Sequence, residues 1–546
     1  MKGIQAVAEI LRREQVEYLF CFPDNSLIDA CAAVGIRPIM TRTERTLVNM
    51  ADGYTRVHNA RRTGVGTVQL GPGAENAFAG VAQAYADGVP LLLLPGAVDQ
   101  RAQGASRVFD AVRNYAGVTK WTDRINSPER IGDFLRRAFG YLRMGQTGPV
   151  VLEIPEDVAA AEVDSDRLRY APVARVRSAA DPDAVRAAAR LLLEAKRPVL
   201  HAGQGVLYAE ATAELIELAE LLDAPVMTTL PGKSAIPEIH PLALGSAGYS
   251  GAKPVAEFLG RSDVVLGLGC SFARSEFAAP LPAGATLIHN TSSEREINKD
   301  YAVAVALLGD ARLVLQQLLD EVRRQGGAGA RGGDGRTRDE IRAVKEAWLA
   351  EWMPRFTSNE SPLSPYRVIW DLMHAVDRTQ TIVTHDSGNP RDQIVPFWEP
   401  FTARGYIGWG KSTQLGYSLG LAMGAKLAAP EKLVINVMGD AAFGMCGMDV
   451  ETAVRERIPI LTVILNNSAL GGYEQYMPIA TELYRTKFLS GQYAQVAAGL
   501  GAYAERVERP SEIVPAIRRA EAAIRDGRPA VLEMITREEP RFSKHW

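Results

Sequence analysis

Short runs rich in valine, isoleucine and leucine alternate with longer helix-type patterns along the whole chain. Many of the runs end in glycine or proline, where a buried strand gives way to a loop. Because parallel neighbours need a crossover helix between them, this alternation predicts α/β domains built on doubly wound parallel sheets. The runs include residues 64–70, 90–94, 149–154, 198–201, 264–268, 433–437 and 459–465.

Length and punctuation divide the chain. At roughly 150 residues per domain, 546 residues exceed a single core. Residues 160–184 are polar and aperiodic, and residues 325–335 form a glycine-rich stretch typical of a flexible linker. We therefore expect three domains of similar design, at residues 1–165, 185–322 and 355–546.

Composition excludes several classes of function. The formal net charge is −3, so no basic excess points to nucleic acid or an anionic membrane surface. The longest apolar run, residues 89–95, is far shorter than the roughly 20 residues that span a bilayer. Charged residues within the first helix pattern argue against a signal peptide. Four cysteines without CxxC spacing argue against a zinc site or a disulfide framework. We expect a cytoplasmic protein without a nucleic-acid or membrane partner.

The strongest chemical pattern lies in the third block. A strand ends in Gly-Asp-Ala-Ala at residues 439–442, a helix pattern covers 448–456, and the next strand ends in Asn466-Asn467. A βαβ unit places Asp440 and Asn467 at the carboxyl ends of neighbouring strands, where open α/β sheets bind ligands. A carboxylate and an amide oxygen, with a loop carbonyl and diphosphate oxygens, suit Mg²⁺. Either piece alone would be explained better as turn residues.

The pair formed by Gly-Asp-Ala and Asn-Asn, separated by residues 442–465, resembles the motif of thiamine diphosphate enzymes. In that family the aspartate, the second asparagine and a carbonyl two residues later hold Mg²⁺. The resemblance therefore implies Asp440, Asn467 and the backbone of Ala469 as metal ligands. It also implies that the cofactor lies against Gly439, Ala441, Ala442, Leu470 and Gly471.

Three ordered stretches of the first block, residues 41–54, 69–76 and 84–90, are similar to the same family. The resemblance puts Glu44 in the place of the glutamate that hydrogen-bonds the aminopyrimidine ring, and puts Gly73 and Asn76 at the cofactor. A carboxylic acid in an apolar cleft can share a proton with that ring and promote loss of the thiazolium proton. Taken alone, Glu44 would be interpreted as a solvent-exposed carboxylate at a helix start.

Two further segments of the third block look like cofactor contacts of this family. Thr413 and Leu415 resemble the stretch whose bulky side chain supports the bent cofactor, although Leu415 alone could equally be a core residue. Gly388 and Asn389 follow a strand and resemble the segment that grips the diphosphate. The resemblance thus implies a pyrimidine-binding first domain, a central domain and a diphosphate-binding third domain.

The likeness to the group of acetolactate synthase and oxalyl-CoA decarboxylase covers about residues 3–535. In that group the central domain binds FAD, ADP or nothing. Flavin-binding synthases carry GxRFDDR, whereas this chain has Gly-Cys-Ser-Phe-Ala-Arg-Ser-Glu at residues 269–276. The missing residues argue against FAD and against acetolactate synthesis as such. Residues 203–208 contain GxG without a third glycine, which favours a structural turn over a dinucleotide loop.

Substrate contacts are expected on two loops. Asn25 follows Pro-Asp, which resembles decarboxylases of phosphonopyruvate and sulfopyruvate, and a structural turn is an equal alternative there. Tyr473 and Glu474 are candidates for substrate contact or general acid. Tyr476 stands where the synthases place a tryptophan.

We therefore expect a thiamine diphosphate- and Mg²⁺-dependent lyase or carboligase acting on a 2-oxo acid, with an electron sink supplied by the cofactor. A 2-hydroxyacyl-CoA lyase or oxalyl-CoA decarboxylase acting on an acyl-CoA is the second choice, because the tail after residue 535 is short. A non-catalytic regulatory relative and a nicotinamide oxidoreductase are alternatives of other classes. In the family, the residues matching Glu44 and Asp440 meet across a subunit interface, which implies an obligate homodimer or a homotetramer.

Overall fold

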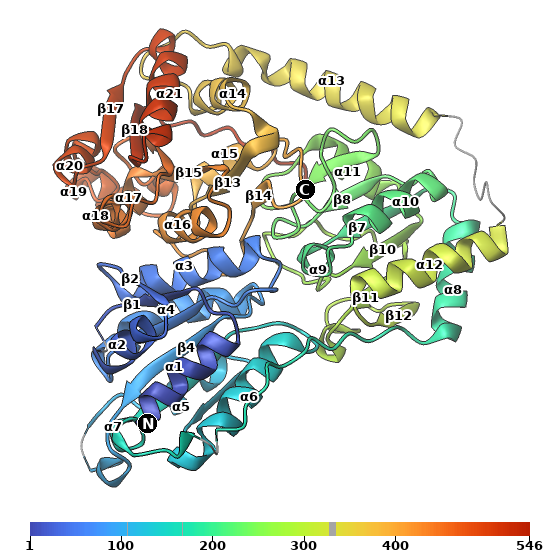
Figure 1. Ribbon diagram of the computed structural model, residues 1–546. Coiled ribbons are helices and arrows are strands. Elements are labelled where there is room, and N and C mark those ends of the chain that lie inside the picture. Colours follow the sequence, from blue (N-terminus) through green and yellow to red (C-terminus); the bar gives the residue numbers. More distant parts are fainter. Residues whose placement is uncertain (24, 106, 166–167, 327–334) are drawn as a thin grey trace.

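The computed structural model describes residues 1–23, 25–105, 107–165, 168–326 and 335–546. It contains three six-stranded sheets, one for each of three successive parts of the chain (Figure 1). Every strand pairing within them is parallel, with helices on their faces. The predicted α/β class with three doubly wound parallel sheets is confirmed. Most of the predicted flexible linker lies outside the described residues.

The N-terminal sheet has the strand order β2-β1-β3-β4-β6-β5. Its strands are β1 (Tyr18–Cys21), β2 (Arg37–Met40), β3 (Val65–Val68), β4 (Leu92–Ala97), β5 (Trp121–Arg124) and β6 (Val150–Pro155). Its helices are α1 (Gly3–Arg13), α2 (Asn25–Ala33), α3 (Glu44–Val57), α4 (Pro72–Ala86), α5 (Ala111–Tyr115), α6 (Ile131–Arg143) and α7 (Glu156–Ala160).

The central sheet has the order β12-β11-β10-β7-β8-β9, so its strand order reverses between β7 and β10. The strands are β7 (Pro198–Ala202), β8 (Val226–Thr228), β9 (Ala243–Ser246), β10 (Val264–Leu268), β11 (Thr286–Thr291) and β12 (Val305–Leu308). The helices are α8 (Pro182–Glu194), α9 (Gln204–Tyr208), α10 (Thr212–Leu222), α11 (Lys253–Gly260) and α12 (Ala311–Gly326).

The C-terminal sheet has the order β14-β13-β15-β16-β18-β17. The strands are β13 (Thr381–His385), β14 (Tyr406–Ile407), β15 (Leu433–Gly439), β16 (Leu461–Asn466), β17 (Tyr503–Val507) and β18 (Ala530–Ile535). The helices are α13 (Arg336–Phe356), α14 (Pro365–Ala375), α15 (Asn389–Ile394), α16 (Ser418–Ala428), α17 (Asp440–Cys446), α18 (Val450–Arg455), α19 (Pro478–Tyr484), α20 (Tyr493–Gly499) and α21 (Pro510–Arg525).

The helix after β15 begins earlier than the sequence pattern predicts. It starts at Asp440 as α17, whereas the expected helix over 448–456 is a 3₁₀ turn, η7 (Gly447–Asp449), followed by α18. Gly439 caps α17 in an extended conformation, and a carboxylate in a first helical turn is favoured by the helix dipole. Asp440 therefore belongs to a helix start rather than to a long loop.

Helices α3 and α16 join the N-terminal and C-terminal domains through close backbone contact, and they lie side by side in Figure 1. A Cβ atom on Gly53 would lie 2.1 Å from the Leu421 carbonyl oxygen, and one on Gly424 would lie 1.9 Å from the Met50 carbonyl oxygen. Only glycine permits this approach, since any side chain would collide with backbone that cannot move cheaply. The two glycines fix how these domains meet.

Replacing Gly424 by alanine is expected to lower the free energy of unfolding by about 3 kcal/mol, because the new methyl group overpacks a rigid contact. Scanning calorimetry would measure this as a fall in Tm. Gly132→Ala is the control, since a Cβ atom on Gly132 of α6 meets nothing within 4 Å. Equal Tm values for the two variants would contradict the close packing of α3 on α16.

None of the described helices combines the length and the apolar character needed to cross a membrane.

Candidate active site

The carboxyl ends of β13, β15 and β16 form one edge of the C-terminal sheet. Gly439 at the end of β15 is in register with Leu465 near the end of β16, so the residues that follow these strands are neighbours. Asp440 begins α17 directly after β15, and Asn467 follows β16. The structure thus brings together the two residues that the sequence assigns to a metal site.

Asp440 is buried, with 3% of its surface exposed. Its Oδ1 atom accepts a hydrogen bond from its neighbour, the Ala441 N–H, at 2.9 Å, while Oδ2 has no hydrogen-bond partner among the described residues. Burial raises the pKa of Asp440 to about 6, against the opposing effect of the Ala441 and Ser468 backbone N–H groups. A buried carboxylate oxygen without a partner requires a compensating ligand, and a cation is the natural one.

The turn after β16 is held from below by a buried pair. Asn466 donates a hydrogen bond to Glu533 at 2.7 Å, and its Oδ1 accepts one from the Ser468 N–H at 2.9 Å. Ser468 adopts the left-handed conformation, with φ 54°. The Asn467 Oδ1 atom then accepts from the Ala469 N–H at 3.1 Å. Glu533 lies in the middle of the apolar strand β18. An acidic residue within an apolar strand is the feature of the sequence that could have pointed to this hydrogen bond.

Two amide side chains meet at Gly471. A Cβ atom there would lie 2.3 Å from Nδ2 of Asn389 and 3.3 Å from Nδ2 of Asn467. Gly388, with φ 78°, caps the helix α15 that begins at Asn389. The predicted cofactor residues Gly388, Asn389, Asn467 and Gly471 therefore share one small region of this sheet edge.

Asp386 begins the segment that resembles the diphosphate grip, and the sequence assigns it no role of its own. It is fully buried at the end of β13 and accepts hydrogen bonds from the Gly416 N–H at 2.9 Å and from the Ser418 hydroxyl at 2.6 Å. The Ser387 hydroxyl adds a bond to the Thr413 carbonyl at 2.9 Å. These contacts tie the loop carrying Thr413 and half-buried Leu415 to the sheet edge. In the sequence, the feature that could have identified Asp386 is a charged residue directly after an apolar strand.

Glu44 is the first residue of α3, after the cap Thr43. Only 8% of the surface of this residue is exposed, so Glu44 does not lie on the open surface of the chain. No hydrogen bond or ion pair of this carboxylate is found within the described ranges. A Cβ atom on Gly416 would lie 3.1 Å from a guanidinium nitrogen of Arg45 and 3.3 Å from the Ala442 carbonyl. The start of α3 therefore lies beside both the Leu415 loop and the Asp440 segment.

The start of α3 is held there by hydrogen bonds to the C-terminal domain. The Arg42 N–H donates to Asp449 Oδ1 at 2.8 Å, and the Thr43 hydroxyl donates to Asp449 Oδ2 at 3.3 Å. Asp449 is fully buried in η7. These bonds join a residue next to Glu44 to the element that follows Asp440, and sequence reasoning did not identify them.

Two other predicted cofactor residues lie at the start of α4, after β3. Gly73 is buried and Asn76 is exposed. Gly71 caps this helix with φ 66°, which favours glycine. Their contact with a cofactor stays a prediction.

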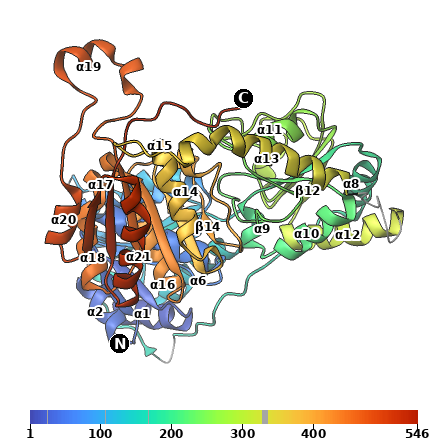
Figure 2. The ribbon, with the colours of Figure 1, turned by 90° about the horizontal axis from the view of Figure 1, so that it is seen from above.

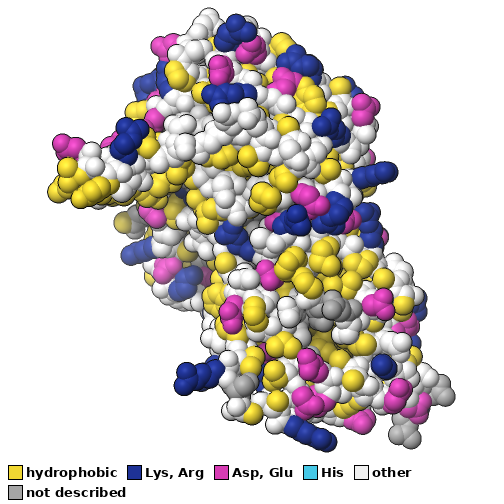
Figure 3. Space-filling model, turned by 90° about the vertical axis from the view of Figure 1, so that its left-hand side faces the viewer, with side chains coloured by type: hydrophobic (Ala, Val, Ile, Leu, Met, Phe, Trp, Pro, Cys, Tyr) yellow, Lys and Arg dark blue, Asp and Glu magenta, His cyan; other side chains and the backbone are white. Residues whose placement is uncertain are grey.

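The predicted substrate residues Tyr473, Glu474 and Tyr476 lie on an exposed arm, residues 468–489, whose outermost part is α19 (Figure 2). Tyr476 is 74% exposed. The hydrogen bond from Lys487 lowers the pKa of Glu474 and pairs the two at 2.7 Å. In Figure 3 the arm is a protruding lobe that carries hydrophobic side chains. Asn25 begins α2, and the placement of its side chain lies outside the described part.

The carboxyl edge of the central sheet holds a small cavity of about 60 Å³, lined by His201, Phe272 and Lys411 among others. The Gly205 N–H there donates to the Gly269 carbonyl at 2.9 Å. This N–H at the start of α9 is therefore already hydrogen-bonded within the protein. Pockets for drug-sized ligands take roughly 300–1,000 Å³. This cavity gives no evidence of a flavin site.

A metal at Asp440 would need mixed oxygen ligands. Across the described ranges there is no group of three or more His, Cys, Asp or Glu side chains that could hold a metal ion alone. One carboxylate with amide, backbone and ligand oxygens is a donor set that suits Mg²⁺. The unpaired Oδ2 of Asp440 and the amides around Gly471 fit such an ion bound together with a diphosphate.

Comparisons with known proteins agree across the chain. The descriptions "Thiamine pyrophosphate enzyme, N-terminal TPP binding domain", "central domain" and "C-terminal TPP binding domain" match residues 1–122, 185–318 and 386–534. A probable acetolactate synthase large subunit of Methanococcus aeolicus is 30% identical over 95% of this chain and 90% of its own length. Acetolactate synthase isozyme 3 large subunit of Escherichia coli K12 is 28% identical over 97% of this chain and 93% of its own length.

Glyoxylate carboligase of Escherichia coli O157:H7 is 28% identical, over 98% of this chain and 92% of its own length. These full-length matches, the three parallel sheets and the Asp440–Asn467 edge all point the same way: the chain belongs to the thiamine pyrophosphate enzyme family.

Proposed function

We propose that this protein is a thiamine diphosphate- and Mg²⁺-dependent enzyme that breaks or forms a carbon–carbon bond beside the carbonyl of a 2-oxo acid. The observation that carries the proposal is the buried, unpaired Oδ2 of Asp440 next to the turn of Asn467. Relatives named acetolactate synthase and glyoxylate carboligase support the reaction class.

In this proposal Asp440, the Asn467 amide oxygen and the Ala469 carbonyl hold Mg²⁺, while Asn389 and the backbone at Gly471 contact the diphosphate. When bound, thiamine diphosphate supplies the electron sink for the carbon–carbon chemistry. Leu415 supports the cofactor from its loop, which Asp386 fixes. Glu44 holds and returns a proton at the aminopyrimidine ring, because the residue is largely buried at the start of α3 and no hydrogen bond or ion pair to another described residue occupies its carboxyl group.

A 2-oxo acid is favoured over an acyl-CoA by the position of the C-terminal tail. Ser543 binds Gly251 of the central domain through two hydrogen bonds, at 2.9 Å and 2.8 Å, so the tail is already engaged there. The residues at positions 269–276 that differ from GxRFDDR support a reaction without flavin.

We further propose a cytoplasmic homodimer or homotetramer with domains at residues 1–165, 185–322 and 355–546. The support for this assembly is that the chain matches members of the family over nearly their whole length. The mass of the protein in solution is the direct measurement. Mass photometry of the cofactor-loaded enzyme would give twice or four times 59.2 kDa. A monomer that is active would contradict the proposal.

The function is tested by supplying purified protein with thiamine diphosphate, Mg²⁺ and a panel of 2-oxo acids that includes pyruvate and glyoxylate. We expect release of CO₂ and formation of a 2-hydroxy-3-oxo acid, an aldehyde or both, with no flavin absorbance in the purified protein. Turnover that needs acyl-CoA instead would favour the second candidate. Cofactor binding without turnover on any substrate would favour a regulatory relative.

A further inference from the structure

The N-terminal and C-terminal domains repeat one structural pattern, and both carry a buried glutamate at the same place in it. Their sheets share a strand order, with β6 between β4 and β5, and β18 between β16 and β17. The fourth residue of β6 is Glu153 and the fourth residue of β18 is Glu533. Both side chains are buried. The N-terminal glutamate therefore serves as a reference for the C-terminal one.

Both carboxylates hold the start of a helix. Glu153 accepts a hydrogen bond from the Ala111 N–H of α5 at 3.1 Å, and Glu533 accepts one from the Ala494 N–H of α20 at 2.9 Å. Each of these helices precedes the edge strand of its sheet, β5 or β17. The N–H groups of a first helical turn lack acceptors within the helix, so this shared contact is explained by folding alone.

The second partner of the two carboxylates differs. Glu153 accepts from Nε of Arg124 at 2.5 Å. Arg506 is the counterpart of Arg124, because each arginine stands opposite the glutamate in the register of its edge strand. Arg506 comes only within 3.9 Å of Glu533, whereas the side-chain amide of Asn466 donates to Glu533 at 2.7 Å. Glu533 thus binds an amide where Glu153 binds a guanidinium.

The N-terminal sheet has no amide to be held at that position. Asn466 ends β16 in register with Ile535, two residues after the glutamate. The corresponding residue of β4 is Ala97, which is in register with Pro155. The exchange of partners therefore occurs only in the sheet whose next residue along the chain is Asn467.

The carboxylate fixes which way the amide of Asn466 points. A carboxylate only accepts hydrogen bonds, so the NH₂ end of the amide must face Glu533. Its Oδ1 atom then faces Ser468, which donates to it through the backbone N–H at 2.9 Å and through the hydroxyl at 3.2 Å. Ser468 has φ 54°, a left-handed conformation that persists in a residue other than glycine only when its surroundings hold it.

We propose that Glu533 is a positioning residue of the metal site and acts through Asn466. By fixing the orientation of that amide, it holds the turn at Ser468 between Asn467 and Ala469, the two residues of this turn that we propose as ligands of Mg²⁺. The inference rests on the metal site of the proposed function. Loss of an outer partner of a metal ligand costs 10–100-fold in metal affinity, so the effect is measurable without turnover.

Replacing Glu533 by glutamine tests the role of the carboxylate. The new side chain has one acceptor oxygen for two donors, the Ala494 N–H and the Asn466 amide. If its oxygen serves Ala494, its NH₂ group faces Asn466, whose amide must turn over and point its own NH₂ group at the Ser468 N–H. We expect Mn²⁺ to bind at least about tenfold more weakly in the presence of thiamine diphosphate. Mn²⁺ shares the oxygen ligands of Mg²⁺, and the EPR signal of the free ion gives the affinity.

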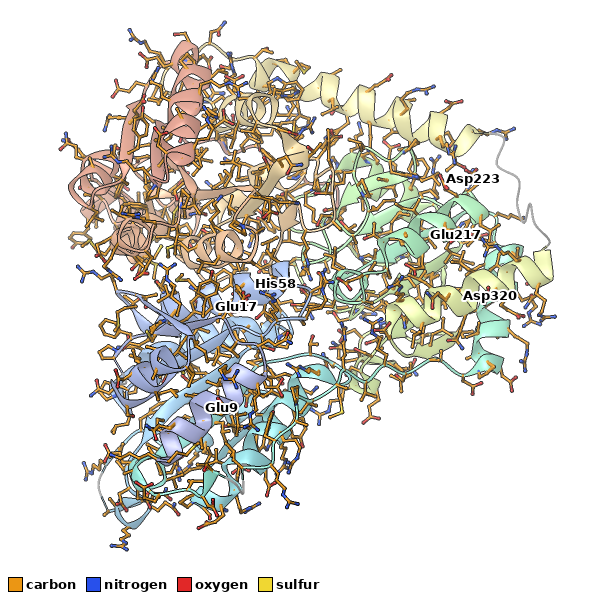
Figure 4. The ribbon with its side chains drawn as sticks, viewed as in Figure 1. Glu9, Glu17, His58, Glu217, Asp223 and Asp320 are labelled. Atoms are coloured by element: carbon orange, nitrogen blue, oxygen red, sulfur yellow. The ribbon has the colours of Figure 1, made fainter. Side chains whose placement is uncertain are left out.

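Two control variants separate this role from stability and from net charge. Glu153→Gln removes the equivalent buried carboxylate of the N-terminal sheet, so it should lower Tm but leave the affinity for Mn²⁺ unchanged. Glu217→Gln removes the same charge from α10 in the central domain, where Figure 4 labels this residue and where it pairs with Arg323. It should change neither quantity appreciably.

A double variant tests the hydrogen-bond orientation directly. In Asn466→Asp combined with Glu533→Gln, the introduced amide donates to the introduced carboxylate, and its oxygen accepts from the Ala494 N–H. The carboxylate also accepts from the Ser468 N–H, so all the hydrogen bonds return with the charge moved by one partner. We expect affinity for Mn²⁺ close to that of the parent. Asn466→Asp alone sets two carboxylates against each other and should bind Mn²⁺ more weakly than the parent.

The outcomes distinguish this proposal from the proposed function. Equal affinity in Glu533→Gln and the parent, no recovery in a folded double variant, or tighter binding by Asn466→Asp alone would overturn the positioning role and leave the function standing. If both Glu533 variants fail to fold while Glu153→Gln folds, the pair serves folding alone and the proposal is also wrong. A parent that binds no Mn²⁺ with the cofactor would remove the metal site and this inference together. Binding as expected, without turnover of any 2-oxo acid, would contradict the function only.

Discussion

Replacing Glu44 by glutamine is expected to lower kcat by about 10²–10⁴-fold, the range that positioned proton transfer contributes. The amide keeps the size of the side chain but cannot hold and return a proton at the aminopyrimidine ring. Because the carboxyl group makes no hydrogen bond or ion pair with other described residues, the substitution should leave the fold intact. CO₂ release from the preferred 2-oxo acid measures the effect.

Glu75→Gln is the matched control, since Glu75 is an exposed acidic residue in the first turn of α4. It should retain full activity. The Tm of Glu44→Gln should equal that of the parent, and its affinity for thiamine diphosphate should change far less than kcat. Unchanged turnover in Glu44→Gln would show that the proton relay is assigned to the wrong residue.

Replacing Asp440 by asparagine is expected to weaken binding of Mg²⁺ with thiamine diphosphate by at least about 100-fold, more than the loss of an outer-shell partner causes. The amide keeps an acceptor for the Ala441 N–H but removes the negative charge that faces the ion. Activity at ordinary cofactor concentrations should then disappear. Titration of the cofactor into the apoenzyme, followed by calorimetry, gives the affinity.

The Tm of the apoenzyme provides a second, independent test of the Asp440→Asn variant. Asp440 is buried, its Oδ2 is unpaired, and its pKa is raised to about 6, so near neutral pH the ionised group costs folding free energy when no ion is bound. Asp440→Asn should therefore keep or raise the Tm of the apoenzyme. It should also abolish the rise in Tm that Mg²⁺ and cofactor cause in the parent.

Asp449→Asn provides the contrast, because Asp449 is buried but satisfied by the Arg42 N–H and by Thr452. That variant should lose Tm without losing the ion. A fall in the apoenzyme Tm for Asp440→Asn, with cofactor affinity preserved, would identify Asp440 as a structural residue and remove the metal site from the proposal.

The Asp440–Asn467 edge could be predicted because it depends on local pattern and on topology alone. Successive parallel strands have their carboxyl ends on one edge, so two strand-ending motifs in one βαβ unit must be neighbours once the strands pair. The boundary of α17 could not be predicted in the same way. Its first turn consists of Asp-Ala-Ala-Phe, which carries no helical period long enough to be recognised, and the capping geometry of Gly439 decides where it begins.

The roles of buried acidic residues could not be predicted from the sequence for a related reason. Asp386, Glu533 and Asp449 matter because their partners, Gly416, Asn466 and Arg42, arrive from distant parts of the chain. A sequence shows that a charge stands in or beside an apolar run, but it does not show which group satisfies that charge. Conversely, Tyr476 looked like a pocket residue by position, whereas it stands on an exposed arm in this single chain.

The alternating runs by themselves determined three doubly wound parallel sheets and, with two strand-ending motifs, the edge at which the chemistry is expected. They could do so because strand period and crossover connection are local properties of the chain. Only the tertiary structure decided that Gly53 and Gly424 lock α3 against α16, and that Glu44 is largely buried with no hydrogen bond or ion pair to another described residue. These depend on contacts between residues hundreds of positions apart, which local periodicity does not encode.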